Sequence, residues 1–322
     1  MRYLHVSEQD GRYVTELREV DVPVPRAGEV LVRVAASGLN RADLSQIAGR
    51  YPPPPGESEI LGLEVSGIVE PTGDHVCALL AGGGHAEYVA VPAGLVFPAP
   101  ATIDLVSAAA IPEAYLTAFV NLVVEGQVSP GAAVLVHAGA SGVGLAAIQL
   151  GKLLGARVAA TTRTRAKLAA LARAGADIAV DAASQNFVAE IESRWGANSV
   201  GVVLDPVGAA TLPGDLAVLA TGGRIIVIAT MGGARPEVDL ALLLKKRARL
   251  IGSTLRSRDR EEKAALVARF RQEVLPAFDT GMLGVAVDSV FPPARAVEAL
   301  QRMRENRNTG KILLDWRQDT AP

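Results

Sequence analysis

The stretch Val134-Leu-Val-His-Ala-Gly-Ala-Ser-Gly-Val-Gly-Leu-Ala-Ala-Ile148 decides the fold. It opens with an apolar run typical of a buried strand and closes on a pattern typical of a helix. The glycine-rich turn between them predicts the local geometry that binds a pyrophosphate. Amide groups at the helix N-terminus, with the helix dipole behind them, stabilise the anion, and glycines remove the Cβ atoms that would block its approach.

The turn fits the fingerprint of dinucleotide-binding proteins with one change. Gly139, Ser141 and Gly144 occupy its three glycine positions, so serine replaces the middle glycine. We predict that the coenzyme contacts the turn along its length, at Gly139, Ala140, Ser141, Gly142, Val143 and Gly144. A strand-to-helix turn that binds nothing is the alternative. A G-x-S-x-G nucleophile elbow is excluded, because Val143 stands where its last glycine should be.

The next predicted strand ends without an acidic residue. NAD-binding enzymes place an Asp or Glu there to bind the ribose hydroxyls, whereas this chain has Ala159-Ala-Thr-Thr-Arg-Thr-Arg-Ala-Lys167. Arg163 and Lys167 would attract a 2′-phosphate, and Thr162 or Thr164 would donate hydrogen bonds to it. We therefore predict NADP(H) as the coenzyme. The alternative explanation of these cations is a solvated first turn of a helix.

From residue 133 onward, apolar runs of strand length alternate with amphipathic stretches of helix length. The predicted strands lie at 133–137, 157–161, 178–181, 201–205, 224–229 and 249–253. The predicted helices lie at 143–154, 165–174, 187–195, 209–219 and 240–246. This alternation predicts βαβ units in a doubly wound parallel sheet, which is an α/β fold of the Rossmann type.

The rest of the chain predicts a second, β-rich domain. Short strands between Gly and Pro clusters are expected at 30–35, 64–70, 75–80 and 87–91. A long helix at 260–278 precedes a strand, a helix and a last strand at 311–315, and we expect this tail to return to the first domain. The predicted domains are therefore residues 1–115 and 256–322 of one unit, with the dinucleotide-binding residues 116–255 inserted between them.

Composition narrows the class of protein. The 322 residues hold 32 Lys and Arg against 34 Asp and Glu, a formal net charge of −2, which gives no electrostatic case for a nucleic-acid binder. The basic stretch Lys245-Lys-Arg-Ala-Arg249, followed by Arg256, Arg258 and Arg260, is interpreted as a solvated helix face. The single cysteine, Cys77, excludes an intrachain disulfide, and a reducing, cytoplasmic compartment fits best.

Neither a signal peptide nor a membrane span is predicted. Charged residues are scattered through the first 14 residues, without an apolar segment. Residues 126–151 carry no formal charge and are long enough to cross a bilayer. Their glycines and Pro130 nevertheless favour a strand, a turn and a helix, so we expect no contact with a membrane.

Stretches along nearly the whole chain carry a family resemblance. They are Gly38-Leu-Asn-Arg-Ala-Asp-Leu44, Gly49-Arg-Tyr-Pro-Pro-Pro-Pro-Gly56, Ile60-Leu-Gly-Leu-Glu-Val-Ser-Gly67, Val76-Cys-Ala-Leu-Leu-Ala-Gly-Gly-Gly84, Pro112-Glu-Ala-Tyr-Leu-Thr117, the glycine turn, Gly252-Ser-Thr-Leu-Arg-Ser-Arg-Asp259 and Gly310-Lys-Ile-Leu-Leu314. The chain resembles the zinc-independent quinone oxidoreductases of the medium-chain dehydrogenase/reductase superfamily, in the subgroup whose animal member is induced by a tumour suppressor. The resemblance implies a GroES-like substrate domain, a Rossmann coenzyme domain, an NADPH-dependent reductase acting in the cleft between them, and a homodimer formed through the Rossmann sheet edge.

The resemblance also assigns residues outside the turn. Asn40 is similar to the family's asparagine near the nicotinamide ribose and carboxamide. Further coenzyme contacts of the family match Thr117, Thr230, Met231, Gly232, Ser253, Leu255 and Lys311. Each has an ordinary structural explanation as well; Asn40, for example, is also placed to cap a helix.

Zinc is not expected. Catalytic zinc typically has three protein ligands such as Cys and His. This chain has one cysteine, Cys77, and its four histidines lie far apart in sequence. The zinc-dependent relatives carry a Cys where this chain has Leu39-Asn40, and Gly-His-Glu where it has Gly62-Leu63-Glu64. We therefore predict no metal.

Two departures from the family pattern bear on ligand binding. Ala182 replaces a tyrosine that helps to hold the 2′-phosphate in the family, and Arg163 is available to compensate. The hairpin between Ile68 and Asp74 is shorter than in the family, which should alter the rim of the substrate domain.

Without a metal, the hydride acceptor must be one that is easily reduced, such as a quinone or an activated enone. Tyr51, just before Pro52–Pro55, is the candidate donor of a hydrogen bond to the acceptor oxygen, because a phenol of pKa about 10 is protonated at neutral pH. Alternatively, Tyr51 only packs on the prolines. The leading hypothesis is an NADPH-dependent quinone reductase. An enoyl reductase of a small-molecule pathway and an NADPH-binding sensor or structural protein without turnover remain as alternatives.

Overall fold

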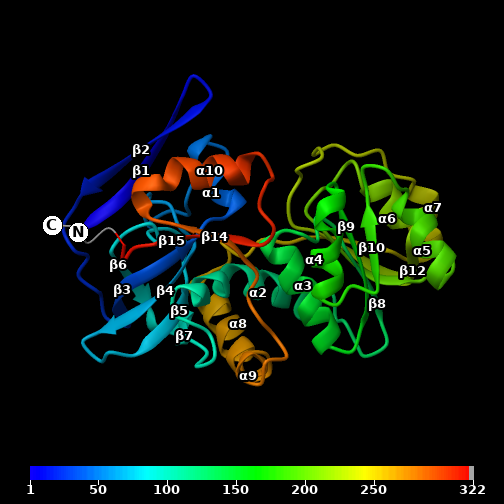
Figure 1. Cartoon of the computed structure of the whole chain (residues 1–322). Coiled ribbons are helices and arrows are strands. Elements are labelled where there is room, and N and C mark those ends of the chain that lie inside the picture. Colours follow the sequence, from blue (N-terminus) through cyan, green and yellow to red (C-terminus); the bar gives the residue numbers. More distant parts are fainter. Residues whose placement is uncertain (319–322) are drawn as a thin grey trace. The chain divides into compact units, whose positions relative to one another are not determined.

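The computed structural model describes residues 1–318 (Figure 1). The chain divides into two compact units: unit 1 combines Met1–Leu116 with the chain from Leu255 onward, and unit 2 is Thr117–Thr254. The predicted domain boundaries differ from these limits by one residue at each junction.

Unit 2 is built on a six-stranded parallel sheet. Its strands are β8 (Ala133–Val136), β9 (Arg157–Thr162), β10 (Ile178–Asp181), β11 (Val200–Asp205), β12 (Leu219–Val227) and β13 (Arg249–Gly252). They lie in the order β10-β9-β8-β11-β12-β13. The chain therefore runs outward from β8 to one edge, returns beside β8, and runs to the other edge. This is the doubly wound Rossmann topology, and it confirms the predicted fold class.

Helices cover both faces of this sheet. They are α3 (Gly142–Leu153), α4 (Leu168–Arg173), α5 (Phe187–Trp195), α6 (Leu212–Val218) and α7 (Leu240–Lys246). A π-helical segment η3 (Val120–Glu125) precedes β8, and a 3-10 turn η4 (Arg165–Lys167) directly precedes α4. Figure 1 shows α3 and α4 on one face and α5, α6 and α7 on the other. The core between the sheet and α5–α7 is made of Leu, Ile, Val and Ala side chains, as the low aromatic content implies.

Periodicity alone predicted most of these elements. The bounds of β10, α5 and α7 agree with the prediction at both ends. The helix predicted at 209–219 begins only at Leu212, because the Asp205 carboxylate accepts amide hydrogen bonds from Val207 and Gly208 and holds residues 206–208 in a turn. A hydrophobic pattern does not reveal such hydrogen bonds between a polar side chain and the nearby backbone.

Unit 1 is built on a seven-stranded sheet. Its strands are β3 (Glu29–Gly38), β4 (Glu64–Glu70), β5 (His75–Leu79), β6 (Tyr88–Pro92), β7 (Val96–Pro98), β14 (Val287–Phe291) and β15 (Lys311–Asp315). The order is β14-β15-β3-β4-β5-β7, and β6 also pairs with β3. The two strands from the end of the chain thus join those of the first hundred residues, as predicted. A separate hairpin of β1 (Arg2–Gln9) and β2 (Arg12–Glu19) was missed by the sequence analysis.

Helices and 3-10 turns complete unit 1. They are α1 (Arg41–Ile47), α2 (Pro112–Phe119, whose last three residues belong to unit 2), α8 (Arg260–Glu273), α9 (Pro276–Asp279) and α10 (Ala296–Arg304), with 3-10 turns η1 (Ala93–Leu95), η2 (Ser107–Ala110) and η5 (Pro293–Arg295). The single helix predicted at 260–278 is wrong: it is interrupted before Pro276, which lacks the amide hydrogen that a continuing helix needs.

The uncharged stretch 126–151 contains β8 and the beginning of α3, as expected. In the described part of the chain, one helical run, Ser107–Glu125, is long and apolar enough to cross a membrane, with a mean hydropathy of 1.4 in its most apolar window. That window is 72% buried inside the structure, as is usual for a core helix.

The interpretation of the basic stretch at 245–249 as a solvated face is wrong for one residue. Lys246 is only 5% exposed, and its amine donates hydrogen bonds to the carbonyl groups of Leu216 and Ala217, both at 2.6 Å. These carbonyls lie in the last turn of α6, where intrahelical donors run out. A lysine from α7 therefore caps the C-terminus of α6.

A buried histidine lies directly under the glycine turn. His137 follows β8, and its Nδ1 and Nε2 lie 2.9 Å from Thr161 Oγ1 and 2.7 Å from Asp215 Oδ1. Thr161 in turn accepts the amide hydrogen bond of Gly139 through its carbonyl, at 2.7 Å. Burial lowers the pKa of His137, but the Asp215 carboxylate, with Asp205 behind it, raises the pKa above its ordinary value overall. His137 is thus the centre of a buried hydrogen-bonded cluster that supports the turn.

Replacing Lys246 by Ala should lower the free energy of unfolding by about 2 kcal/mol, because two carbonyls of α6 lose a charged donor. The matched control is Lys245→Ala, at the exposed neighbouring position, which should change stability by less than about 0.5 kcal/mol. Chemical denaturation of both variants measures the difference. Equal effects would show that the buried amine does not support α6.

Asp215→Asn should make stability depend differently on pH. The folded-state pKa of His137 lies above its unfolded value of about 6.5, so the ion pair contributes fully below that pH and is lost as the pH rises through the folded pKa. The stability advantage of the wild type over Asp215→Asn should therefore shrink as the pH rises above about 6.5 in denaturation experiments. A constant difference over this range would mean that His137 is uncharged in the folded chain.

Candidate functional site

The glycine turn brings a helix N-terminus against the end of β8. Helix α3 begins at Gly142, and the Ser141 hydroxyl caps it by accepting a hydrogen bond from the Gly144 amide at 3.0 Å. A Cβ at Gly144 would lie 2.5 Å from the Ala138 carbonyl oxygen and 2.6 Å from the Gly139 Cα. Only glycine fits there, which is the role of the third glycine in a dinucleotide fingerprint. Because the first amides of a helix have no intrahelical acceptor, the turn presents free donors to an anion.

The predicted phosphate-binding residues lie at the end of β9. Arg163 is exposed, and it has no hydrogen-bond or ion-pair partner among the described residues. Lys167 is partly exposed, whereas Thr162 is buried and its hydroxyl accepts a hydrogen bond from the Thr164 amide at 3.3 Å. This end of the strand therefore offers a free cation to a phosphate.

Asp181 is the acidic residue that lies beside the end of β9, and its side chain binds its own loop. Asp181 pairs with Thr162 across β10 and β9. Its carboxylate accepts hydrogen bonds from the Ala183 amide at 3.1 Å and the Ser184 hydroxyl at 2.9 Å. These bonds hold the loop that contains Ala182.

Other predicted coenzyme residues of unit 2 lie beyond the carboxyl ends of β12 and β13. The amides of Met231 and Gly232 donate hydrogen bonds to the carbonyls of Pro206 and Val207, at 3.2 and 2.7 Å, so the loops after β11 and β12 are held together. Ser253 is buried directly after β13, and its hydroxyl has no partner within the described residues. Ligands of doubly wound sheets bind at this edge, near the point where the strand order reverses. The free amides, the cation and this unpartnered hydroxyl fit a dinucleotide.

Thr230 and Thr117 complete the predicted set of unit 2. Thr230 is exposed in the loop that follows β12. Thr117 is the first residue of the unit and accepts a hydrogen bond from the Asn121 side chain through its carbonyl, at 2.7 Å. Leu255, predicted with them, is the first residue after the unit and is 6% exposed.

In unit 1, Asn40 belongs to a buried polar cluster. Its amide nitrogen donates to Glu64 Oε1 at 2.9 Å, and its amide oxygen accepts a hydrogen bond from the Lys311 amine at 2.8 Å. Lys311 also donates to the Leu39 carbonyl at 2.8 Å and forms an ion pair with Glu64. All three protons of the lysine are therefore occupied, and the Asn40 carboxamide is oriented by a cation on one side and an anion on the other.

Glu64 ties this cluster to the rest of the unit, and the sequence analysis did not recognise its role. Its side chain is fully buried, and its second oxygen accepts the Glu113 amide hydrogen bond at 2.8 Å, at the start of α2. Asn40 directly precedes α1 and forms a capping box with Asp43, in which the Asn40 amide donates to the Asp43 carboxylate at 2.6 Å. Besides its bonds with Glu64 and Lys311, the Asn40 side chain donates a hydrogen bond to the Gly38 carbonyl at 3.2 Å.

Tyr51 lies in the segment between α1 and β4. Its side chain is partly buried, and burial raises the pKa of its phenol above the ordinary value, with a smaller contribution from Glu113. The phenol is therefore protonated over the physiological pH range and can donate a hydrogen bond.

The residues that the family resemblance predicts at the zinc-ligand positions are apolar or paired. Leu39 and Leu63 are 3% and 1% exposed. Cys77 is fully buried, its thiol donates to the Ala108 carbonyl, and burial raises its pKa strongly, while His75 on the same strand is exposed. Within residues 1–318, no three His, Cys, Asp or Glu side chains form a group able to hold a metal.

The hairpin between β4 and β5 closes in a tight turn. The Val69 amide donates to the Asp74 carbonyl at 3.0 Å, and the Gly73 amide donates to the Val69 carbonyl at 2.9 Å. Only residues 71–74 connect the two strands.

Comparisons with known proteins agree with this architecture. Residues 26–101 match the family described as alcohol dehydrogenase GroES-like domain, and residues 142–271 match the family described as zinc-binding dehydrogenase. Quinone oxidoreductase of Homo sapiens is 29% identical over 326 residues, which cover 98% of this chain and 97% of the relative. A phenolphthiocerol/phthiocerol polyketide synthase protein of Mycobacterium tuberculosis is 32% identical over 319 residues, 95% of this chain but 14% of that longer protein.

The solved structures include a close relative in fold and sequence. The quinone oxidoreductase from Thermus thermophilus, solved also in complex with NADPH, is 34% identical, with a TM-score of 0.84. The match covers 98% of this chain and 100% of the other. The glycine turn, the doubly wound sheet and whole-chain likeness to quinone oxidoreductases agree: the chain belongs to the quinone oxidoreductase-like enzymes of the medium-chain dehydrogenase/reductase superfamily.

Proposed function

We propose that this enzyme uses NADP(H), without zinc, to reduce quinones by hydride transfer. The choice of coenzyme rests on the end of β9. Arg163 is exposed there and has no partner among the described residues, and residues 159–167 contain no Asp or Glu. A carboxylate there would repel a 2′-phosphate, whereas a guanidinium binds it through two parallel hydrogen bonds. The NADPH complex of the Thermus thermophilus relative supports the same choice.

Each unit is proposed to contribute separate groups. In unit 2, the amides after Gly139 hold the pyrophosphate, Thr162, Arg163 and Lys167 hold the 2′-phosphate, and the segments after β12 and β13 contact the nicotinamide. When bound, the coenzyme supplies the hydride. In unit 1, Asn40 contacts the nicotinamide ribose or carboxamide, and Tyr51 donates a hydrogen bond to the acceptor oxygen.

Lys311 is proposed to act on the coenzyme through Asn40. Its three protons already have acceptors in Leu39, Asn40 and Glu64. A direct contact with the coenzyme would break one of these buried bonds. Its positive charge instead fixes which way the Asn40 carboxamide points.

Zinc independence rests on the residues at the two ligand positions. Leu39 and Leu63 are buried apolar side chains, and Glu64 is already paired with Lys311. The acceptor must then accept hydride without a Lewis acid, a condition that quinones meet.

Reduction of a polarised C=C bond is the second candidate, because it needs the same hydride geometry. The observation that favours it is the likeness to the polyketide synthase protein. The tight β4–β5 turn changes the outline of unit 1 and is compatible with either acceptor.

We further propose a cytoplasmic homodimer. Strand β13 lies at the edge of its sheet, and Leu250 on it is 48% exposed. An exposed strand edge is satisfied by pairing with a second copy. The single, buried cysteine agrees with a reducing compartment.

Arg163→Ala should raise the KM for NADPH about tenfold and leave the KM for NADH nearly unchanged, because only NADPH carries the 2′-phosphate. Arg165→Ala is the matched control: it removes an equally exposed cation two residues away and should affect neither coenzyme. Steady-state kinetics with both coenzymes measure the effect. Equal use of NADH and NADPH by the wild type would overturn the coenzyme assignment.

A panel of quinones and enones, with the oxidation of NADPH followed by its absorbance, tests the acceptor class. We expect quinone turnover that survives treatment with a metal chelator, because no step needs a Lewis acid. Turnover of enones alone would establish the second candidate. NADPH binding without turnover of either class would instead indicate a sensor or structural protein.

A further inference from the structure

Arg256 is a buried cation that the sequence analysis wrongly placed on a solvated face. Its side chain is only 4% exposed. The guanidinium donates hydrogen bonds to three acceptors of unit 1: the Ala81 carbonyl at 2.8 Å, the Tyr51 carbonyl at 3.1 Å and the Gln46 side-chain oxygen at 2.7 Å. These acceptors come from three different segments of the chain. Arg256 therefore fixes three parts of unit 1 relative to one another: α1, the segment after β5, and residues 51–57, called the proline-rich segment below.

The same guanidinium lies over the ring of Tyr51. Its central carbon is 5.2 Å from the ring centroid, within the range of a cation–π interaction. Tyr51 is thus held at two points, through its backbone carbonyl and through its aromatic face. Two attachments restrict both the backbone and the side-chain torsions of the tyrosine.

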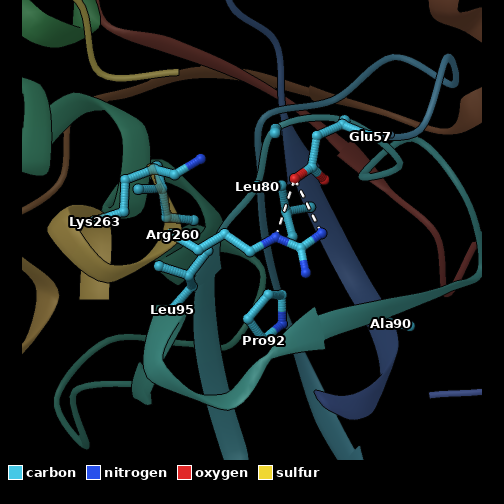
Figure 2. Close-up of a pocket in the computed structure, with 10 residues that line it drawn as sticks. Glu57, Leu80, Ala90, Pro92, Leu95, Arg260 and Lys263 are labelled. Carbon is cyan, nitrogen blue, oxygen red and sulfur yellow. Dashed lines mark hydrogen bonds and ion pairs between the residues drawn. The ribbon is translucent and has the colours of Figure 1, made fainter. Parts of the chain in front are cut away.

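The far end of the proline-rich segment is held separately. Arg260, four residues after Arg256, donates hydrogen bonds to the Glu57 carboxylate at 3.3 and 3.1 Å across a pocket of unit 1 (Figure 2). Lys263, which also lines this pocket, donates to the Arg256 carbonyl at 3.3 Å. Arg256 therefore holds residue 51, and Arg260 holds residue 57, of the same segment.

The charge of Arg256 is not neutralised by a direct ion pair within the described residues. Its three side-chain acceptors there are two carbonyls and an amide. Burial lowers its pKa, and Tyr51, Asp43, Glu113 and Glu57 act on it in the opposite direction. Beside these three acceptors, the uncompensated positive charge lies next to the Tyr51 phenol ring, so its field also acts on the phenol.

We propose that Arg256 is a positioning residue for Tyr51, holding the phenol in one orientation and strengthening it as a hydrogen-bond donor to the acceptor oxygen. This inference rests on the role proposed above for Tyr51. The positive charge favours electron density on the phenol oxygen and so makes its proton more acidic, against the opposing effect of burial. Arg256 itself needs no contact with substrate.

The test uses Arg256→Gln, which removes the charge, and Arg256→Lys, which keeps the charge but loses the planar fork. Arg260→Gln is the matched control, because it releases the other end of the segment without touching the tyrosine. Tyr51 is observed by 19F NMR of the full chain labelled with 3-fluorotyrosine, its signal being the one missing from Tyr51→Phe. NADPH affinity is measured separately by fluorescence.

We expect Arg256→Gln to move the Tyr51 signal and shift its titration to higher pH. It should lower kcat/KM for a quinone by about 10–100-fold, with NADPH affinity changed less than about twofold. Arg256→Lys should cause a smaller shift of the Tyr51 titration and a smaller loss of kcat/KM. Arg260→Gln should change neither quantity. In the Tyr51→Phe background, Arg256→Gln should cause little further loss.

Two results would overturn the proposal: an unchanged Tyr51 signal in Arg256→Gln, or an equal loss of kcat/KM with and without the Tyr51 hydroxyl. The role of Tyr51 is tested independently. If Arg256→Gln moves the signal while Tyr51→Phe leaves turnover unchanged, the contact is supported and the catalytic role proposed for Tyr51 is overturned.

Discussion

Unit 2 depends on the close approach of the first turn of α3 to the backbone that leaves β8. A Cβ at Gly144 would overlap the Ala138 carbonyl and the Gly139 Cα, so the approach exists only with glycine. It places the free amides of the helix beyond the end of β8, beside the point where the strand order reverses. The His137–Asp215 pair lies beneath the same turn and joins β8 and β9 to α6. The anion site is therefore a consequence of backbone packing.

Unit 1 depends instead on buried charges with defined partners. A buried charge is costly unless its geometry is satisfied, and removal of one partner leaves the other uncompensated. Lys311 and Glu64 satisfy one another and orient Asn40 between them. Arg256 is satisfied by carbonyl groups and by the ring of Tyr51. The two residues proposed to act on coenzyme and acceptor are thus the ones whose orientation these charges determine.

The accuracy of the sequence prediction follows the strength of the local pattern. Strands and helices of unit 2 were predicted well because both faces of a parallel sheet are covered, so its strands are continuous apolar runs. The β1–β2 hairpin was missed because few of its side chains are buried and its residues are largely polar. Its one local signal was Asp10-Gly11, both with positive φ, a pair typical of two-residue hairpin turns.

The amino-acid sequence by itself determined the glycine turn, the order of strands and helices, and the cation at the end of β9, because these depend on residues close together in the chain. Only the tertiary structure decided which charged side chains are buried and what they hold. Asn40 and Lys311 are 271 residues apart, and Tyr51 and Arg256 are 205 apart. Hydrophobic periodicity is a local pattern and does not predict such distant pairs. From sequence alone a lysine or arginine is predicted to be exposed to solvent, because the acceptors that would let it be buried are known only from the fold.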